Sequence, residues 1–309
     1  MNRVEQPPAD NRGIPGNNWT VMNAAPASGR VPSAHRLIRP TTLAALAFVL
    51  IAVPLRAQEP TADEIVDLAV ARAELQRDSG LDQAFEATLE SITEQLDGDG
   101  EVKETERETY RQYPVEGVIF EELVAREGEP LDENDAEDEV DRREKFAKEV
   151  RERRAKGEDP EPEDENRVAF DREFVERYQF ELVGEEPLDG IDCWVVTLEP
   201  KPGKLPERRR IDTALNKSTG TLWISKDDYG LALVEFEMAS SVRFWGGILG
   251  TLRNTVGRLE FRRYDDATWV PKLIDIRLDI RILFSNIRRR IVREWIDYSP
   301  LPLPANLPG

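Results

Sequence analysis

The chain has 309 residues, with 61 acidic and 42 basic side chains and a formal net charge of −19. An acidic excess of this size argues against a nucleic-acid partner and against attachment to an anionic membrane through bulk charge. His35 is the only histidine and Cys193 the only cysteine. The region after residue 57 therefore lacks the residues for Ser-His-Asp or Cys-His catalysis, for a His-ligated metal and for an internal disulfide.

The longest apolar run of the chain, residues 41–55, predicts an export signal. Basic residues precede this run, and Ala57 follows it closely before the sequence turns acidic. A basic lead, a short apolar core and a small residue at the cut are typical of a secretion signal, whereas a membrane-spanning helix needs about 20 apolar residues. We therefore expect cleavage near Ala57 and a periplasmic mature chain; an uncleaved N-terminal anchor is the alternative. Residues 1–57 are interpreted as lead and signal peptide, and residues 58–309 as a single domain.

Residues 61–78 have the spacing of an amphipathic helix. Apolar side chains recur mostly at three- and four-residue intervals, and Thr61 can cap the start with Glu64 three residues later, as in a capping box. Ser79-Gly80 ends the pattern. We predict one ordinary helix here, available to cover one face of a sheet.

Three strands are expected between residues 84 and 126. Residues 84–97 would also suit a helix, but the turn signal Asp97-Gly98-Asp99-Gly100 follows directly, which favours a strand. Residues 102–113 are then the hairpin partner of this strand, and residues 118–126 form a third strand after a second turn.

An abrupt change of composition marks residues 132–167. Nearly every residue is charged, with acidic side chains first and basic side chains later, the order that a helix dipole favours. We interpret the segment as a charged helical insertion, either a solvated helix or a flexible stretch. The alternative is a calcium-binding or protein-docking role.

Hairpins return after residue 170. The predicted strand pairs, in chain order, are 178–184 with 191–200, 220–225 with 231–243, and 258–264 with 269–284, before a last strand over 287–298 and a Pro-rich tail over 300–309. From Ile274 to Phe284 apolar residues alternate with mostly polar ones, so this strand has one apolar and one largely polar face. Repeated hairpins without long intervening helices predict an antiparallel β-meander.

Residues 244–256 interrupt the meander with an apolar segment that contains glycines. Its apolar side chains share one face at helical spacing, but each glycine weakens a helix by about 1 kcal/mol relative to alanine. We predict a mid-chain apolar helix here, which the resemblance described below implies lies on the concave face of the sheet. It is either a movable lid over an apolar cavity or a fixed cap on the core.

Nothing in the sequence predicts an enzyme, a metal site or a cofactor. It contains no G-x-S-x-G, P-loop or G-x-G-x-x-G motif. Cys193 lies beside Trp194 in an apolar stretch and is interpreted as a buried small hydrophobic residue. The basic runs at 208–210 and 288–290 could contact an anionic headgroup or partner, with solvated charge as the default interpretation.

Several hairpin and strand segments resemble a known superfamily. They are LDGDGEV at 96–102, VAREGEPL at 124–131, LVGEEPLDGIDCWVVTLEPKPG at 182–203, NKSTGTLWIS at 216–225 and FWGGILGTL at 244–252. Over residues 85–309 the chain resembles the periplasmic lipoprotein-carrier superfamily (LolA, LolB and RseB-like proteins), and most of all uncharacterised bacterial proteins labelled as outer-membrane lipoprotein-sorting. The resemblance implies a mainly antiparallel β fold with α: an open, curved half-barrel with helices on its concave face, around a cavity for acyl chains.

The expected function is that of a periplasmic, non-catalytic binding or carrier protein for lipid or lipoprotein acyl chains. Each buried CH₂ of a ligand contributes roughly 0.8 kcal/mol in an apolar cavity, so a single chain gives useful affinity. The alternative is an envelope interaction or sensor module that docks a protein partner through the same fold and the acidic insertion. The candidate cavity residues are Trp194, Trp223, Phe236, Phe244, Trp245, Ile248, Leu249, Leu252, Ile276, Leu278, Ile280 and Phe284.

Overall fold

The computed structural model describes residues 59–161, 168–244, 250–266, 268–283 and 285–301, all within the second of two compact units of the chain, Ala57–Gly309. The predicted signal peptide lies outside the described residues, as do Trp245, Ile248, Leu249, Phe284 and residues 302–309 of the predicted tail. In the part of the chain that is described, no helix is long and apolar enough to cross a membrane.

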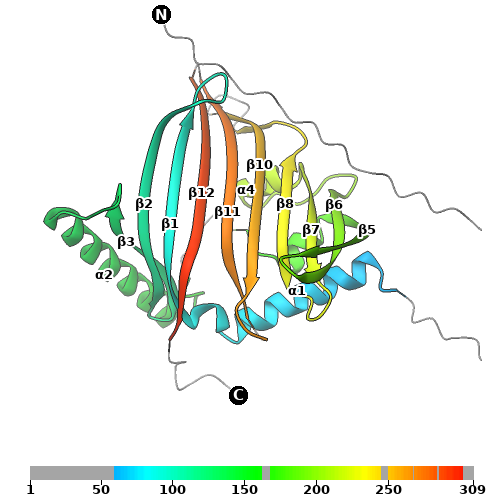
Figure 1. The fold of residues 1–309 in the computed structure, drawn as a ribbon, viewed down its shortest axis with the longest axis horizontal. Coiled ribbons are helices and arrows are strands. Elements are labelled where there is room, and N and C mark those ends of the chain that lie inside the picture. Colours follow the sequence, from blue (N-terminus) through cyan, green and yellow to red (C-terminus); the bar gives the residue numbers. More distant parts are fainter. Residues whose placement is uncertain (1–58, 162–167, 245–249, 267, 284, 302–309) are drawn as a thin grey trace, which may run out of the picture. The chain divides into compact units, whose positions relative to one another are not determined.

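The unit consists of one large sheet and a few helices (Figure 1). The helices are α1 (Ala62–Asp78), the single-turn η1 (Leu81–Gln83), α2 (Glu133–Lys156), α3 (Arg172–Val175) and α4 (Arg210–Leu215). The strands are β1 (Phe85–Leu96), β2 (Val102–Val115), β3 (Val118–Arg126), β4 (Glu129–Pro130), β5 (Tyr178–Leu188), β6 (Ile191–Pro200), β7 (Ser218–Ser225), β8 (Leu231–Met238), β9 (Val242–Phe244), β10 (Gly250–Arg263), β11 (Trp269–Ile282) and β12 (Ser285–Pro300).

The sheet has 12 strands in the order β4-β3-β2-β1-β12-β11-β10-β8-β7-β6-β5, with β9 paired to the start of β10. All pairings are antiparallel. Because β4 and β5 each have one neighbour among the described strands, the sheet stays open. The predicted fold class, a mainly antiparallel open sheet with an N-terminal helix and a mid-chain helix, is confirmed.

Local sequence explains where α1 begins. The Thr61 hydroxyl accepts a hydrogen bond from the Glu64 N–H at 3.3 Å, and the Glu64 carboxylate accepts one from the Thr61 N–H at 2.8 Å. This is the predicted capping box, which satisfies backbone donors that a helix start leaves unpaired. Its buried apolar stripe consists of Ile65, Val66, Ala69 and Val70.

The last turn of α1 is fastened to the first residue of β11. The Gln76 side-chain amide donates to the Trp269 carbonyl oxygen at 2.8 Å and accepts from the Trp269 N–H at 2.9 Å. Gln76 thus pairs with this backbone as a neighbouring strand would, which fixes the helix relative to the sheet.

The turn after β1 explains why residues 84–97, whose sequence suits either a helix or a strand, form a strand. One carboxylate oxygen of Asp97 accepts hydrogen bonds from the N–H groups of Asp99 and Glu101, each at 2.9 Å. Aspartate stabilises turns in this way by bonding to its own local backbone. The turn joins β1 to β2 in antiparallel register, so the strand interpretation is confirmed.

The position predicted for the mid-chain helix, 244–256, is wrong for the residues that the structure describes. Phe244 ends β9 and residues 250–256 form the first half of β10, where Thr251 lies opposite Arg243 on one side and Arg281 on the other. Both edges of this segment are paired, and the β-branched Thr255 and Val256 favour a strand. The mid-chain helix is α2 instead, and β8 ends at Met238 rather than at residue 243.

Helix α2 covers the free edge of β3. The Glu139 carboxylate accepts a hydrogen bond from the Leu123 N–H at 3.1 Å, and Arg154 donates to the Glu116 carbonyl oxygen at 2.8 Å. Arg142 donates to the carbonyl oxygen of Glu121. Side chains of α2 therefore occupy backbone groups that would otherwise be open to pairing with another chain.

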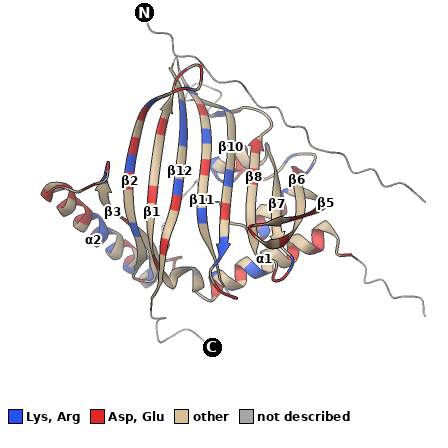
Figure 2. Cartoon of the chain, viewed as in Figure 1, with Lys and Arg blue, Asp and Glu red and all other residues tan. Residues whose placement is uncertain are grey.

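The charged insertion is consequently an ordered helix over most of its length. Asp132 caps its start and Gly157, with φ 73°, ends it. Val150 is buried and Phe146 packs against Phe120 of β3, with ring centroids 5.1 Å apart. The remaining surface of α2 carries both acidic and basic side chains (Figure 2), with acidic residues in the first turn and basic residues in the last.

Candidate functional site

Helix α1 distinguishes the two faces of the sheet. Val196, Leu198, Leu222 and Ile224 of β6 and β7 pack in one cluster with the apolar stripe of α1, and we call their side the α1 face. Residues directly opposite each other in an antiparallel pair point to the same face. One such row runs across the sheet through Leu198, Gly220, Phe236, Gly257, Ile276 and Ile291.

Only part of the α1 face is covered. Beneath the helix, Leu198 is 3% exposed and Leu222 0% exposed. On β11 of the same face, Ile276 and Leu278 are partly exposed and Ile282 is 40% exposed. Among the described residues, α1 packs against β5 and β7, and no helix packs to that extent on β10 or β11.

The uncovered part, which we call the open apolar face, brings together five of the predicted cavity residues: Phe236, Leu252, Ile276, Leu278 and Ile280. Leu252 lies opposite Ile280, and the other residues follow from the register and the alternation of β11. The ring of Phe236 lies against Gly257, where an added Cβ would come within 2.3 Å of the ring. Glycine at this position therefore makes room for the aromatic side chain on β10.

The other predicted cavity residues in the described region lie elsewhere. Trp194 is 9% exposed within the core under α1 and stacks on Tyr229, with ring centroids 5.2 Å apart. Trp223 points to the opposite face, where its indole N–H donates to the Glu186 carboxylate at 3.2 Å. For Phe244 the structure describes the backbone, in β9, and not the side chain.

Sequence reasoning missed four further apolar residues of this face. Leu259 lies opposite Ile274, which was recognised in the strand pattern but not as a cavity residue. Ile287 and Ile291 of β12 lie opposite Ile280 and Ile276. The alternation along β11 was enough to assign Ile274 to this face. Leu259, Ile287 and Ile291 could be assigned only once the register between the strands was known.

The face opposite α1 carries paired charges along β10, β11 and β12, strands in which Figure 2 shows both acidic and basic residues. Arg290 donates two hydrogen bonds to Asp275, at 2.9 and 2.7 Å, and this guanidinium holds the pKa of the Asp275 carboxyl below its ordinary value. Arg288 pairs with Asp279 at 3.2 Å. These ion pairs account for the polar half of the alternation in β11 and place the basic run 288–290 partly within the sheet.

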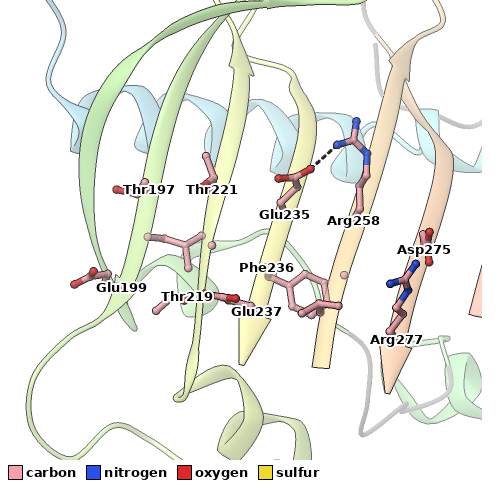
Figure 3. Close-up of a pocket in the computed structure, with 14 residues that line it drawn as sticks. Thr197, Glu199, Thr219, Thr221, Glu235, Phe236, Glu237, Arg258, Asp275 and Arg277 are labelled. Carbon is pink, nitrogen blue, oxygen red and sulfur yellow. Dashed lines mark hydrogen bonds and ion pairs between the residues drawn. The ribbon is translucent and has the colours of Figure 1, made fainter. Parts of the chain in front are cut away.

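A hollow of about 550 Å³ lies on this polar face, across β6, β7, β8, β10 and β11 (Figure 3). Its lining residues on the polar face are Thr197, Glu199, Thr219, Thr221, Glu235, Glu237, Val256, Arg258, Asp275 and Arg277; Leu198, Gly220, Phe236 and Gly257, which belong to the row on the α1 face, line it as well. The sequence analysis did not predict it. A threonine and glutamate alternation in these strands was visible, but only the strand order places those residues side by side.

Cys193 is 1% exposed, and burial raises the pKa of its thiol to about 11. The prediction of a buried small hydrophobic residue is confirmed. No group of three or more His, Cys, Asp or Glu residues in the described ranges is arranged to hold a metal ion.

The fold defined by these observations is an open antiparallel sheet, partly covered on one face by an N-terminal helix. No protein-family model and no curated protein sequence matches the chain. Solved structures similar to it include a LolA superfamily protein from Nitrosomonas europaea, with 13% identity over 79% of this chain and 96% of that chain and a TM-score of 0.29. A DUF1329 family protein from Desulfovibrio piger has 13% identity over 78% of this chain and 93% of that chain, with a TM-score of 0.28.

A chain of the Pseudomonas aeruginosa MucA/MucB complex is also similar, with 10% identity over 75% of this chain and 99% of that chain and a TM-score of 0.23. The LolA superfamily, which the sequence resembles, is thus represented among the solved structures that are similar to the chain.

Proposed function

We propose that the protein is a periplasmic, non-catalytic binding or carrier protein for lipid or lipoprotein acyl chains, and that the open apolar face holds the chains. The observation that carries this proposal is the exposure of Ile276, Leu278 and Ile282 on a face whose other half is a closed core. A soluble protein rarely leaves contiguous apolar surface open unless that surface binds something.

The chemistry of this face suits an acyl chain. Phe236, Leu252, Ile274, Ile276, Leu278 and Ile280 present hydrocarbon only, and the ion pairs of β11 all lie on the opposite face. Apolar contact is not directional and gains roughly 0.8 kcal/mol for each buried CH₂, so neither a catalytic group nor a charged anchor is required. Arg289 of β12, opposite Leu278, would lie beside an acyl headgroup at the margin of the face.

Native mass spectrometry with lipid extraction, on protein purified from a periplasmic fraction, tests this proposal. We expect co-purifying phospholipid or acylated peptide in the wild type and its loss in the double variant Leu278→Arg with Ile280→Arg. Two buried charges on this face would make the insertion of an acyl chain unfavourable.

Val292→Arg provides the matched control, because Val292 lies opposite Asp275 and so places the same charge on the polar face. This variant should retain lipid. Retention of lipid by a folded Leu278→Arg, Ile280→Arg protein would show that acyl chains do not bind here, and lipid-free wild type after incubation with lipids would contradict the carrier function itself.

A second function, docking of an envelope protein partner, is favoured by α2. Its outer surface is charged and exposed, while Glu139 and Arg142 fasten it to β3 and Arg154 fastens it to the turn before β3. Replacing exposed outward residues such as Glu144 and Lys148 by alanine leaves those fastenings intact. Loss of a partner in a pull-down with retained lipid binding would favour this function over the carrier.

A further inference from the structure

Most of the charged residues around the hollow on the polar face form ion pairs. Arg258 pairs with Glu235 and with Glu260, the latter at 2.6 Å, and Arg290 pairs with Asp275 and, at 3.4 Å, with Glu94. Figure 3 shows the pair of Glu235 and Arg258 at the rim of the hollow. Charges on this face are therefore satisfied across neighbouring strands wherever an opposite charge lies next to them.

Glu237 and Arg277 depart from this rule. Neither side chain makes a hydrogen bond or ion pair within the part of the chain that the structure describes. The reason lies in the register: Val256 of β10 lies between them, opposite Glu237 on one side and Arg277 on the other. Neighbouring strands are about 4.8 Å apart, so the two charged residues are separated by about 9.6 Å at the backbone.

The three residues form a row of carboxylate, apolar side chain and guanidinium. Val256 is 44% exposed, so its side chain is open to a ligand between the two charges. On the carboxylate side the row continues with Thr219, opposite Glu237, while Glu199 also lines the hollow. The Thr219 hydroxyl is likewise without a hydrogen-bond partner in the described region.

We infer that this hollow binds a small linear zwitterion, with an ammonium group at Glu237 and a carboxylate at Arg277. An ammonium ion donates three hydrogen bonds, which Glu237, Glu199 and the Thr219 hydroxyl can accept. The guanidinium of Arg277 matches the geometry of a carboxylate. A short methylene chain between the charged ends lies over Val256.

The surrounding charges exclude simpler ligands. Glu199, Glu235 and Glu237 repel a purely anionic ligand, and the guanidinium of Arg277, whose charge also acts on Asp275 of the same strand, repels a purely cationic ligand. A ligand with one charge of each sign, spaced along the row, satisfies both ends at once.

Titration of the isotope-labelled protein with ε-aminocaproate, followed by NMR chemical shifts, tests the site. The charged ends of this probe lie nearly as far apart as the two residues when its chain is extended. We expect shifts of the Glu237, Val256 and Arg277 amides at millimolar probe. Glycine, whose charged ends are too close, and hexylamine or hexanoate, which carry one charge each, should bind more weakly.

Glu237→Gln and Arg277→Gln should each weaken ε-aminocaproate binding by up to about fivefold, as expected for the loss of one solvent-accessible ion pair. Glu294→Gln and Arg107→Gln, exposed positions outside the hollow, are the matched controls and should leave binding unchanged. All four positions are at the surface, so folding is checked simply by circular dichroism.

Absence of shifts in the wild type, or equal affinity of the probe and hexylamine, would overturn the inference. Equal affinity of the hollow variants and their controls would do the same. The site lies on the face opposite the acyl-chain candidate, so its failure leaves the carrier proposal untouched, and lipid binding by the Glu237→Gln variant should equal that of the wild type.

Discussion

Two regions of the α1 face have the same sequence pattern and different environments. On β6 and β7 the alternating apolar residues Leu198, Leu222 and Ile224 are buried beneath α1. On β11 the equally regular Ile276, Leu278 and Ile280 remain partly exposed. Alternation along a strand therefore determines which side a residue occupies, but not whether that side is covered.

The extent of the cover follows from the length of the helix. α1 has 17 residues, and a helix of that length measures about 26 Å at 1.5 Å per residue. Strands about 4.8 Å apart allow it to cross at most about five of them. The sheet has 12, so much of this face depends on another element or on a ligand.

The largest expected effect compares one leucine from each region. Leu222→Ala should reduce the free energy of unfolding by about 2–5 kcal/mol, because it leaves a cavity in a closed core. Leu278→Ala should cost about 1 kcal/mol or less, because water already reaches that side chain. Urea denaturation of both variants measures the difference, and equal costs would mean that the open apolar face is covered in solution.

A second variant weakens the attachment of α1 to the sheet. Gln76→Ala removes both hydrogen bonds to Trp269 and should destabilise the protein by about 1–2 kcal/mol. Hydrogen exchange should accelerate at the Trp269 amide and in the last turns of α1, with β2 and β3 unchanged as the internal control. Uniform acceleration across the sheet would show that Gln76 does not hold the helix locally.

A smaller effect is expected at the other end of the helix. Thr61→Ala removes the capping box and should cost about 1 kcal/mol, while Thr61→Ser should retain most of the stability. Thermal unfolding of the two variants distinguishes capping from packing of the threonine methyl group. Equal loss in both would assign the effect to the methyl group.

The smallest effect is a pH dependence of the contact between α1 and the sheet, where Asp228, in the turn between β7 and β8, pairs with Arg72 of α1 at 3.9 Å. Burial acts to raise the pKa of Asp228, but hydrogen bonds from Trp269, Ser225 and Gly230 outweigh it, with a contribution from Arg263, and the pKa is lowered from 3.8. The stability that Asp228 contributes is thus fully present above the ordinary pKa and is lost as the pH falls below 3.8 through the lowered value.

Asp228→Asn should therefore destabilise the protein at neutral pH, by an amount that stays constant down to the ordinary carboxyl pKa and shrinks in more acidic solution. Chemical denaturation of variant and wild type across this range measures the change. A constant difference at every pH would mean that the charge of Asp228 contributes nothing to attaching the helix.

Much of the fold could be predicted because its signals are local. The capping box of Thr61 and Glu64, the Asp97 turn and the alternation from Ile274 onward each depend on residues close in sequence. The helix predicted over 244–256 was wrong because it rested on the helical spacing of the apolar residues alone. The spacing does not reveal that β8, β9 and β11 supply hydrogen-bonding partners on both sides of this segment.

The candidate site could be predicted only in part, for the same reason. Ile276, Leu278 and Ile280 could be grouped because they alternate along one strand, whereas the sequence could not tell that Trp223 of β7 points to the opposite face. Glu237, Val256 and Arg277 lie in a row across three strands. The sequence of one strand does not reveal which strands are its neighbours. The periodicity of apolar residues within a strand does not determine its register with a strand that is distant in sequence.

The pairing of β1 with β12 has a consequence for how the protein is made. Phe85 lies opposite Pro300, so β1 has no partner on that side until nearly the whole unit has been synthesised. Contacts between residues so distant in sequence form late and make folding slow. The middle of the sheet, where β1 pairs with β12, is therefore among the last parts of the fold that can form.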